Sequence, residues 1–76
     1  MEEEINYREF LRFMLQHFDI AVLRETEKFI DLEKGYRIEW ENDRLYKLIH
    51  KGEVVAPFTD IEVLCYFLQE DMKLNG

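Results

Sequence analysis

The chain has few of the residues that cross-link a small fold or break its helices and strands: one cysteine, one proline and three glycines among 76 residues. A single cysteine cannot form a disulfide within the chain, which excludes the usual staple of small secreted domains. No apolar run approaches the roughly 20 residues that a membrane-spanning helix needs. The acidic start, Met1 to Glu4, lacks the basic and apolar segments of a signal peptide. We therefore expect one small domain over residues 1–76, cytoplasmic and without membrane association.

The motifs that indicate catalysis or cofactor binding are also missing. The sequence has no C-x-x-C, H-x-x-x-H or H-E-x-x-H spacing, no P-loop and no nucleophile elbow. His17 and Asp19 form an H-x-D pair, but residues two apart on a helix point to different sides. Cys65 lies on an apolar helical stripe, where a thiol is a small buried hydrophobe. We therefore expect no enzymatic activity, no metal and no cofactor.

Positive charge is scarce. Ten bases stand against 17 acids, and the formal net charge is −7. Residues 34–51 form the only stretch in which bases outnumber acids, and there the two signs alternate. Binding to a phosphate backbone needs a basic patch well in excess of its acids, so we expect no direct nucleic-acid binding.

Helical periodicity marks the first third of the chain. Apolar residues recur at three- and four-residue steps at Tyr7, Phe10, Leu11, Met14, Phe18, Ala21 and Val22. This spacing predicts a helix from about Glu4 to at least Gln16, which either continues to Arg24 or is interrupted near Asp19.

A second helix is predicted over Thr59–Leu74. Its start has the pattern of a capping box, in which the Thr59 hydroxyl accepts a hydrogen bond from the Glu62 amide. One apolar stripe is continuous and suits a core: Ile61, Leu64, Cys65, Leu68 and Met72. A second stripe lies well over a quarter-turn away and consists of Val63, Phe67 and Leu74.

The stretch from Lys28 to Phe58 has the pattern of an antiparallel meander. Turn signals recur about every nine residues, at Lys34-Gly35, Asn42-Asp43 and Lys51-Gly52. Short strands joined by tight loops fit this spacing. An alternative for residues 20–34 is a second helix that ends at Gly35, although its apolar residues scatter around the helix.

The register follows from the loops and from cross-strand chemistry. A loop over residues 33–35 places Asp31 opposite Arg37, and the next hairpin pairs Trp40 with Tyr46 and Glu39 with Lys47. A register slipped by one residue would pair Trp40 with Leu45 and turn every side chain of that strand over. We prefer the first register because it joins acid to base. It leaves three apolar residues on the outer face of the sheet, Leu45, Ile49 and Val55.

Together these segments predict a two-layer α+β domain. It has an N-terminal helix, an antiparallel β-meander of three to four strands, and a C-terminal helix packed on the sheet.

The second helical stripe carries the functional hypothesis. In so small a chain, one helical face covers the core, so Val63, Phe67 and Leu74 need a partner outside it, with Phe13 of the first helix in support. We therefore expect a small acidic, non-enzymatic interaction or regulatory protein. It self-associates, most simply as a homodimer, or serves as a subunit that binds another protein.

The alternative belongs to another class: an acidic decoy that blocks the nucleic-acid site of a host enzyme. The hairpin and helix over residues 48–68 resemble a local ββα pattern of small accessory proteins from phages and mobile elements, a pattern that carries no functional residues. A decoy needs carboxylates spaced like phosphates, and Glu2, Glu3, Glu4 and Glu9 have that arrangement only loosely.

Overall fold

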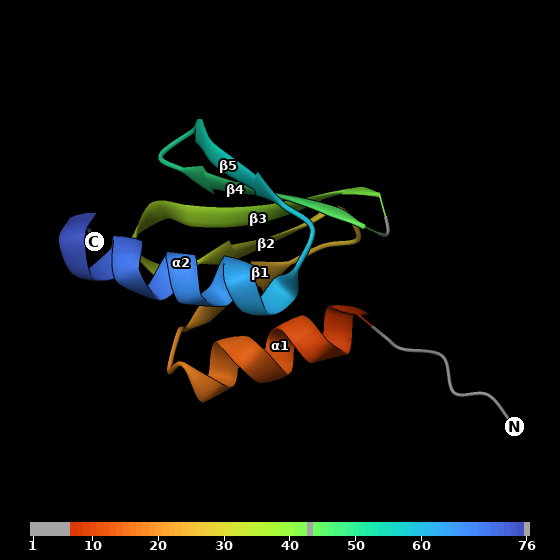
Figure 1. Ribbon diagram of the computed structural model, residues 1–76, viewed down its shortest axis with the longest axis horizontal. Coiled ribbons are helices and arrows are strands. Elements are labelled where there is room, and N and C mark those ends of the chain that lie inside the picture. Colours follow the sequence, from red (N-terminus) through yellow and green to blue (C-terminus); the bar gives the residue numbers. More distant parts are fainter. Residues whose placement is uncertain (1–6, 43, 76) are drawn as a thin grey trace, which may run out of the picture.

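The computed structural model describes residues 7–42 and 44–75. Two α-helices and five β-strands follow one another along the chain (Figure 1). Their bounds are α1 Tyr7–His17, β1 Val22–Glu25, β2 Phe29–Leu32, β3 Tyr36–Asn42, β4 Leu45–His50, β5 Glu53–Phe58 and α2 Ile61–Asn75, with a 3-10 turn at Glu33–Gly35.

The five strands form one antiparallel sheet in the order β1-β2-β3-β4-β5. Both helices lie on the same side of this sheet, and α1 runs alongside α2 (Figure 1). The predicted α+β fold is confirmed, but the sheet has five strands rather than three to four. The additional strand is β1, which falls where the sequence suggested either more of the first helix or a second one.

Helix α1 ends at His17 because the chain turns into the left-handed region at Asp19, whose φ is 62°. The Asp19 amide donates to the Gln16 carbonyl, and the Ile20 amide donates to the Leu15 carbonyl. These are the two hydrogen bonds of a Schellman cap, and the buried Ile20 supplies its apolar contact. The continuation to Arg24 was therefore wrong, and the interruption near Asp19 is confirmed. The predicted start at Glu4 lies outside the described residues.

Strand β1 gives no alternating pattern, because all four of its residues are exposed at the edge of the sheet. A tight turn joins it to β2: the Thr26 hydroxyl oxygen accepts hydrogen bonds from the Lys28 and Phe29 amides, both at 3.2 Å. The alternative helix over residues 20–34 is wrong, since this segment contains two strands and their turn.

The preferred register is confirmed. Asp31 lies opposite Arg37, and Trp40 opposite Tyr46. Glu39 also lies opposite Lys47, but the Lys47 ammonium forms its ion pair diagonally with Glu41, at 2.8 Å. The turn at residues 33–35 requires positive φ at its end, where Gly35 has a φ of 83°.

Helix α2 begins at Ile61, and its N-cap lies one residue later than predicted. The Asp60 carboxylate accepts hydrogen bonds from the Glu62 amide at 2.8 Å and from the Val63 amide at 3.3 Å. Asp60 is therefore the N-cap, and the capping role assigned to Thr59 was wrong. An ionised cap also interacts with the positive end of the helix dipole, which a hydroxyl does less well.

The core lies between the helices and the inner face of the sheet. Its buried residues are Leu11, Met14, Leu15, Ile20, Ile30, Leu32, Tyr36, Ile38, Tyr46, Leu48, Ile61, Leu64, Cys65 and Leu68. The predicted stripe of α2 is confirmed, with Met72 partly buried. In α1, the predicted pattern missed Leu15, which is fully buried, and included Tyr7 and Phe10, which stay exposed.

Candidate protein-interaction surface

The outward side of the two helices carries exposed apolar and aromatic side chains. We call this set the helical surface, and it consists of Phe13, Val63, Tyr66, Phe67 and Leu74. Because α2 directs its core stripe toward the sheet, the residues on the opposite side of the helix face away from the molecule. The exposed fractions there are large: Val63 53%, Tyr66 59%, Phe67 39% and Leu74 80%, and on α1 Phe13 has 62%. All four residues predicted as an interface are therefore exposed.

A chain of ring contacts connects α1 to α2 across this surface. The Phe13 ring stacks on His17 with centroids 6.4 Å apart, and His17 contacts Phe18 edge-on at 5.4 Å. Phe18 in turn contacts Tyr66 of α2 at 5.1 Å. These contacts link Phe13 to α2 only indirectly, through the rings of His17 and Phe18.

The sequence reasoning missed Tyr66. It lies three residues after Val63, so it belongs to the same side of the helix. Counting a tyrosine as apolar in the stripe would have found it, because the ring offers apolar area while the hydroxyl stays hydrated.

Phe67 and Leu74 occupy different settings on α2. The Phe67 ring lies 5.3 Å from the ring of Phe58 at the end of β5, so part of its area is already covered within the chain. Leu74 lies two turns later, beyond Glu70, whose carboxylate is 3.6 Å from the Lys73 ammonium. Both charged side chains are well exposed, so this ion pair is weak and can be exchanged for another.

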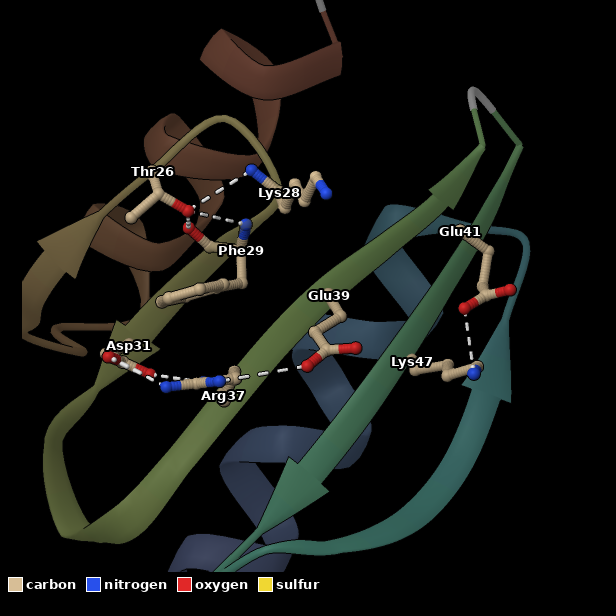
Figure 2. Close-up of polar contacts among 8 residues, drawn as sticks. All are labelled: Thr26, Lys28, Phe29, Asp31, Arg37, Glu39, Glu41 and Lys47. Carbon is tan, nitrogen blue, oxygen red and sulfur yellow. Dashed lines mark hydrogen bonds and ion pairs between the residues drawn. The ribbon is translucent and has the colours of Figure 1, made fainter.

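The outer face of the sheet has a different character. Figure 2 shows charged side chains along this face, with the helices behind the sheet. Arg37 bonds Asp31 at 2.6 Å and lies 3.8 Å from Glu39, while its guanidinium covers the ring of Phe29 at 3.8 Å (Figure 2). Hydrogen bonding to Asp31 raises the pKa of Arg37 further above its usual range. Of the residues predicted to be apolar excess here, Leu45 and Ile49 are half-buried and Val55 is exposed at 37%.

A polar cluster ties the last turns of α2 to the sheet. The buried Tyr36 hydroxyl donates to the Asp71 carboxylate at 2.5 Å, and the Tyr36 ring stacks on His50 with centroids 4.0 Å apart. Burial first, then the hydrogen bond to Asp71 and its negative charge, raise the pKa of Tyr36 well above its usual value. The His50 Nε2 atom is buried without a hydrogen-bond partner among the described residues. This cluster joins the two layers of the fold.

The residues considered for chemistry from the sequence, Cys65, His17 and Asp19, occupy different settings in the structure. Cys65 is fully buried, and burial raises the pKa of its thiol to about 12. His17 ends α1 and is held between two phenylalanine rings, while Asp19 lies in the turn that follows. Within residues 7–42 and 44–75, no group of three or more His, Cys, Asp or Glu side chains is placed to hold a metal ion. Of the acids considered for a decoy, Glu9 lies on α1, and Glu2, Glu3 and Glu4 lie outside the described residues.

Neither helix in the described part of the chain is long and apolar enough to cross a membrane. Comparison of the chain with protein-family models, with curated proteins and with solved structures finds no match in any of the three.

Proposed function

We propose that this chain is a small, acidic, non-enzymatic interaction protein that works by self-association or as a subunit of a larger assembly, using the helical surface. The observation that carries the proposal is the exposure of Val63, Tyr66 and Leu74 on the outward side of α2, together with the exposure of Phe13 on the neighbouring helix α1. Isolated exposed apolar residues are common, but aromatic and aliphatic side chains gathered on one face are typical of protein interfaces.

The position of these residues supports this use. The core beneath α2 is complete without them, since Ile61, Leu64, Cys65 and Leu68 are all buried by the protein's own sheet and α1. The residues of the helical surface therefore lie outside the buried core, although Phe67 contacts Phe58 and Tyr66 contacts Phe18 at its edge. Covering their exposed apolar area with another protein would remove it from water.

Two valines of nearly equal exposure provide the test. Val63 on α2 is 53% exposed, and Val54 on β5 is 57% exposed but lies outside the helical surface. The variants Val63→Asp and Val54→Asp add the same charge and remove the same apolar group. The solution mass of each should be measured by light scattering over a dilution series, at low and at high salt.

We expect the wild type and Val54→Asp to associate beyond the monomer, and Val63→Asp to be monomeric with an unchanged circular dichroism spectrum. Because apolar contacts are not screened, the wild-type mass should persist in high salt. Equal masses for the two variants would contradict a role for the helical surface. A monomeric wild type would exclude self-association and leave only the subunit form of the proposal.

A further inference from the structure

We infer that the partner of the helical surface is a second copy of this chain, with α2 packed antiparallel against α2 of that copy about a two-fold axis. This inference rests on the proposed function, because it uses the same surface. What favours a second copy over a different protein is that the outward side of α2 is complementary to itself when one helix is reversed.

The complementarity follows from a spacing of eleven residues. Glu62 and Lys73 are eleven residues apart, as are Val63 and Leu74, and eleven residues make three turns and about 20°. Each pair therefore occupies one side of the helix, with one member in the first turn and the other in the last. In an antiparallel pair with the axis level with Leu68, Glu62 comes within about one residue rise, about 1.5 Å, of Lys73 of the second copy. Val63 meets Leu74 of that copy with the same offset.

Charge supports this arrangement. Glu62 is exposed and has no ion-pair partner among the described residues, and Lys73 is the only base in α2. Reversal of the helix creates two Glu62–Lys73 contacts per dimer, one at each end. A parallel pair would instead place Glu62 against Glu62 and Lys73 against Lys73, which is unfavourable in a chain with a net charge of −7.

The centre of the same arrangement also pairs well. Tyr66 comes level with Glu70 of the second copy, so the Tyr66 hydroxyl can donate to the one carboxylate that interrupts the apolar surface. The two Phe67 rings lie near the axis, where interfaces are most fully desolvated.

The remaining residue of the helical surface, Phe13, lies on α1. The start of α1 lies beside the start of α2, since Phe10 and Ile61 line one hollow, and Phe18 contacts Tyr66. Phe13 lies between Phe10 and Phe18 along the chain, so it is level with the first turns of α2. In the reversed dimer it would be level with the last turn of α2 of the second copy.

Charge reversal tests this pairing. The variants are Glu62→Lys, Lys73→Glu and the double variant, with dissociation constants measured by light scattering or sedimentation at low salt. Each single reversal places like charges together at both ends, so we expect its dissociation constant to rise about tenfold. The double variant should return to about the wild-type value. An equimolar mixture of the two single variants should also associate as tightly as the wild type, because each supplies the charge that the other lacks.

The controls are Glu53→Lys and Lys28→Glu, two exposed positions away from the helices that change the net charge by the same amounts. We expect neither to alter the dissociation constant beyond about threefold when the measurement is repeated at about 0.15 M salt, where the Debye length is about 8 Å and distant surface charges are screened.

The outcomes separate this inference from the proposed function. If Val63→Asp dissociates the protein but single and double reversals behave alike, the helical surface is the interface and the antiparallel pairing is overturned. If the wild type is monomeric throughout, the second copy is overturned as the partner. If charge reversals act as expected but Val63→Asp has no effect, the apolar contact assigned to the helical surface is overturned.

Discussion

The two outward faces of the molecule differ in how far their aromatic side chains are covered by neighbours within the chain. On the sheet face, Phe29 lies beneath the guanidinium of Arg37, which is itself held by Asp31 (Figure 2). On the helical surface, Phe13 contacts the ring of His17 and Tyr66 contacts the ring of Phe18, and both remain more than half exposed. An apolar residue therefore points to a partner only when its neighbours within the chain leave it uncovered.

The difference arises from how side chains neighbour one another. In the sheet, a residue meets side chains of the two adjacent strands, so Arg37 of β3 can reach both Asp31 and Phe29 of β2. On a helix, the exposed neighbours of Val63 are residues three and four positions away on the same helix, which point outward beside it and cannot lie over it. Only another element, or another chain, can cover that side.

The largest effect that we expect concerns the inner side of α2. Because burial raises the pKa of Cys65 to about 12, the folded chain holds about a thousandfold less thiolate than a free cysteine at pH 8. Labelling by a thiol reagent should therefore be at least about a thousandfold slower in the native protein than in urea. A rate equal to that of a free thiol would mean that Cys65 is not buried. It would contradict the difference between the buried and the exposed stripe of α2.

A matched truncation on each face compares the two directly. Phe67→Ala should raise the dissociation constant of the proposed dimer by tenfold or more, because each dimer would lose two central rings. Phe29→Ala should leave the mass unchanged and lower the free energy of unfolding by about 1–2 kcal/mol, through lost burial and the lost contact with Arg37. Light scattering and urea denaturation measure the two quantities. If Phe29→Ala raised the dissociation constant and Phe67→Ala left it unchanged, the assignment of the interface to the helical surface would be wrong.

The hydrogen bond from Tyr36 to Asp71 should make stability depend on alkaline pH. Since the pKa of Tyr36 is raised in the folded state, its contribution is fully present below about pH 10 and is lost as the unfolded chain alone ionises above it. From this residue we expect a loss of up to about 1.4 kcal/mol per pH unit above pH 10.

The variant Tyr36→Phe removes the ionising group and serves as the control. At neutral pH its free energy of unfolding should be about 1–2 kcal/mol lower than that of the wild type, because the buried hydrogen bond is gone. Its urea midpoint should therefore also be lower. Between pH 9 and 11 its midpoint should fall less steeply. Parallel curves for the two proteins would show that Tyr36 does not couple to folding.

The smallest effect concerns the first turn of α2. Asp60→Ala should lower the free energy of unfolding by about 1 kcal/mol, because the Glu62 and Val63 amides lose their acceptor. Thr59→Ala, one residue earlier, should change it by less than about 0.5 kcal/mol. Urea denaturation of both variants at neutral pH makes the measurement. A larger loss for Thr59→Ala would restore the hydroxyl cap that the sequence pattern favoured.

Much of the fold could be predicted from local patterns. The pairing of Asp31 with Arg37 and of Trp40 with Tyr46 followed from loop length, alternation and charge, all of which lie within a few residues along the chain. The strand β1 could not be predicted in this way. Its four residues are all exposed at the sheet edge, so they do not show the alternation of buried and exposed residues that marks a strand in the sequence.

The candidate surface was predictable in part. Val63, Phe67 and Leu74 stood out because a helix needs only one apolar stripe, whereas Tyr66 was not included in that stripe. The link between Phe13 and α2 depends on the rings of His17, Phe18 and Tyr66, which no spacing in the sequence brings together.

The periods of 3.6 and of two residues, the turn glycines and the alternating charges are local, and from them the two helices and the hairpins of β2 to β5 could be derived from the residues alone. Which neighbours cover which side chains is a matter of three-dimensional packing. Tertiary structure therefore decided that Phe29 is covered by Arg37 and that the outward side of α2 stays uncovered. Contacts between residues distant in sequence depend on how whole elements pack, and periodicity along the chain does not contain that information.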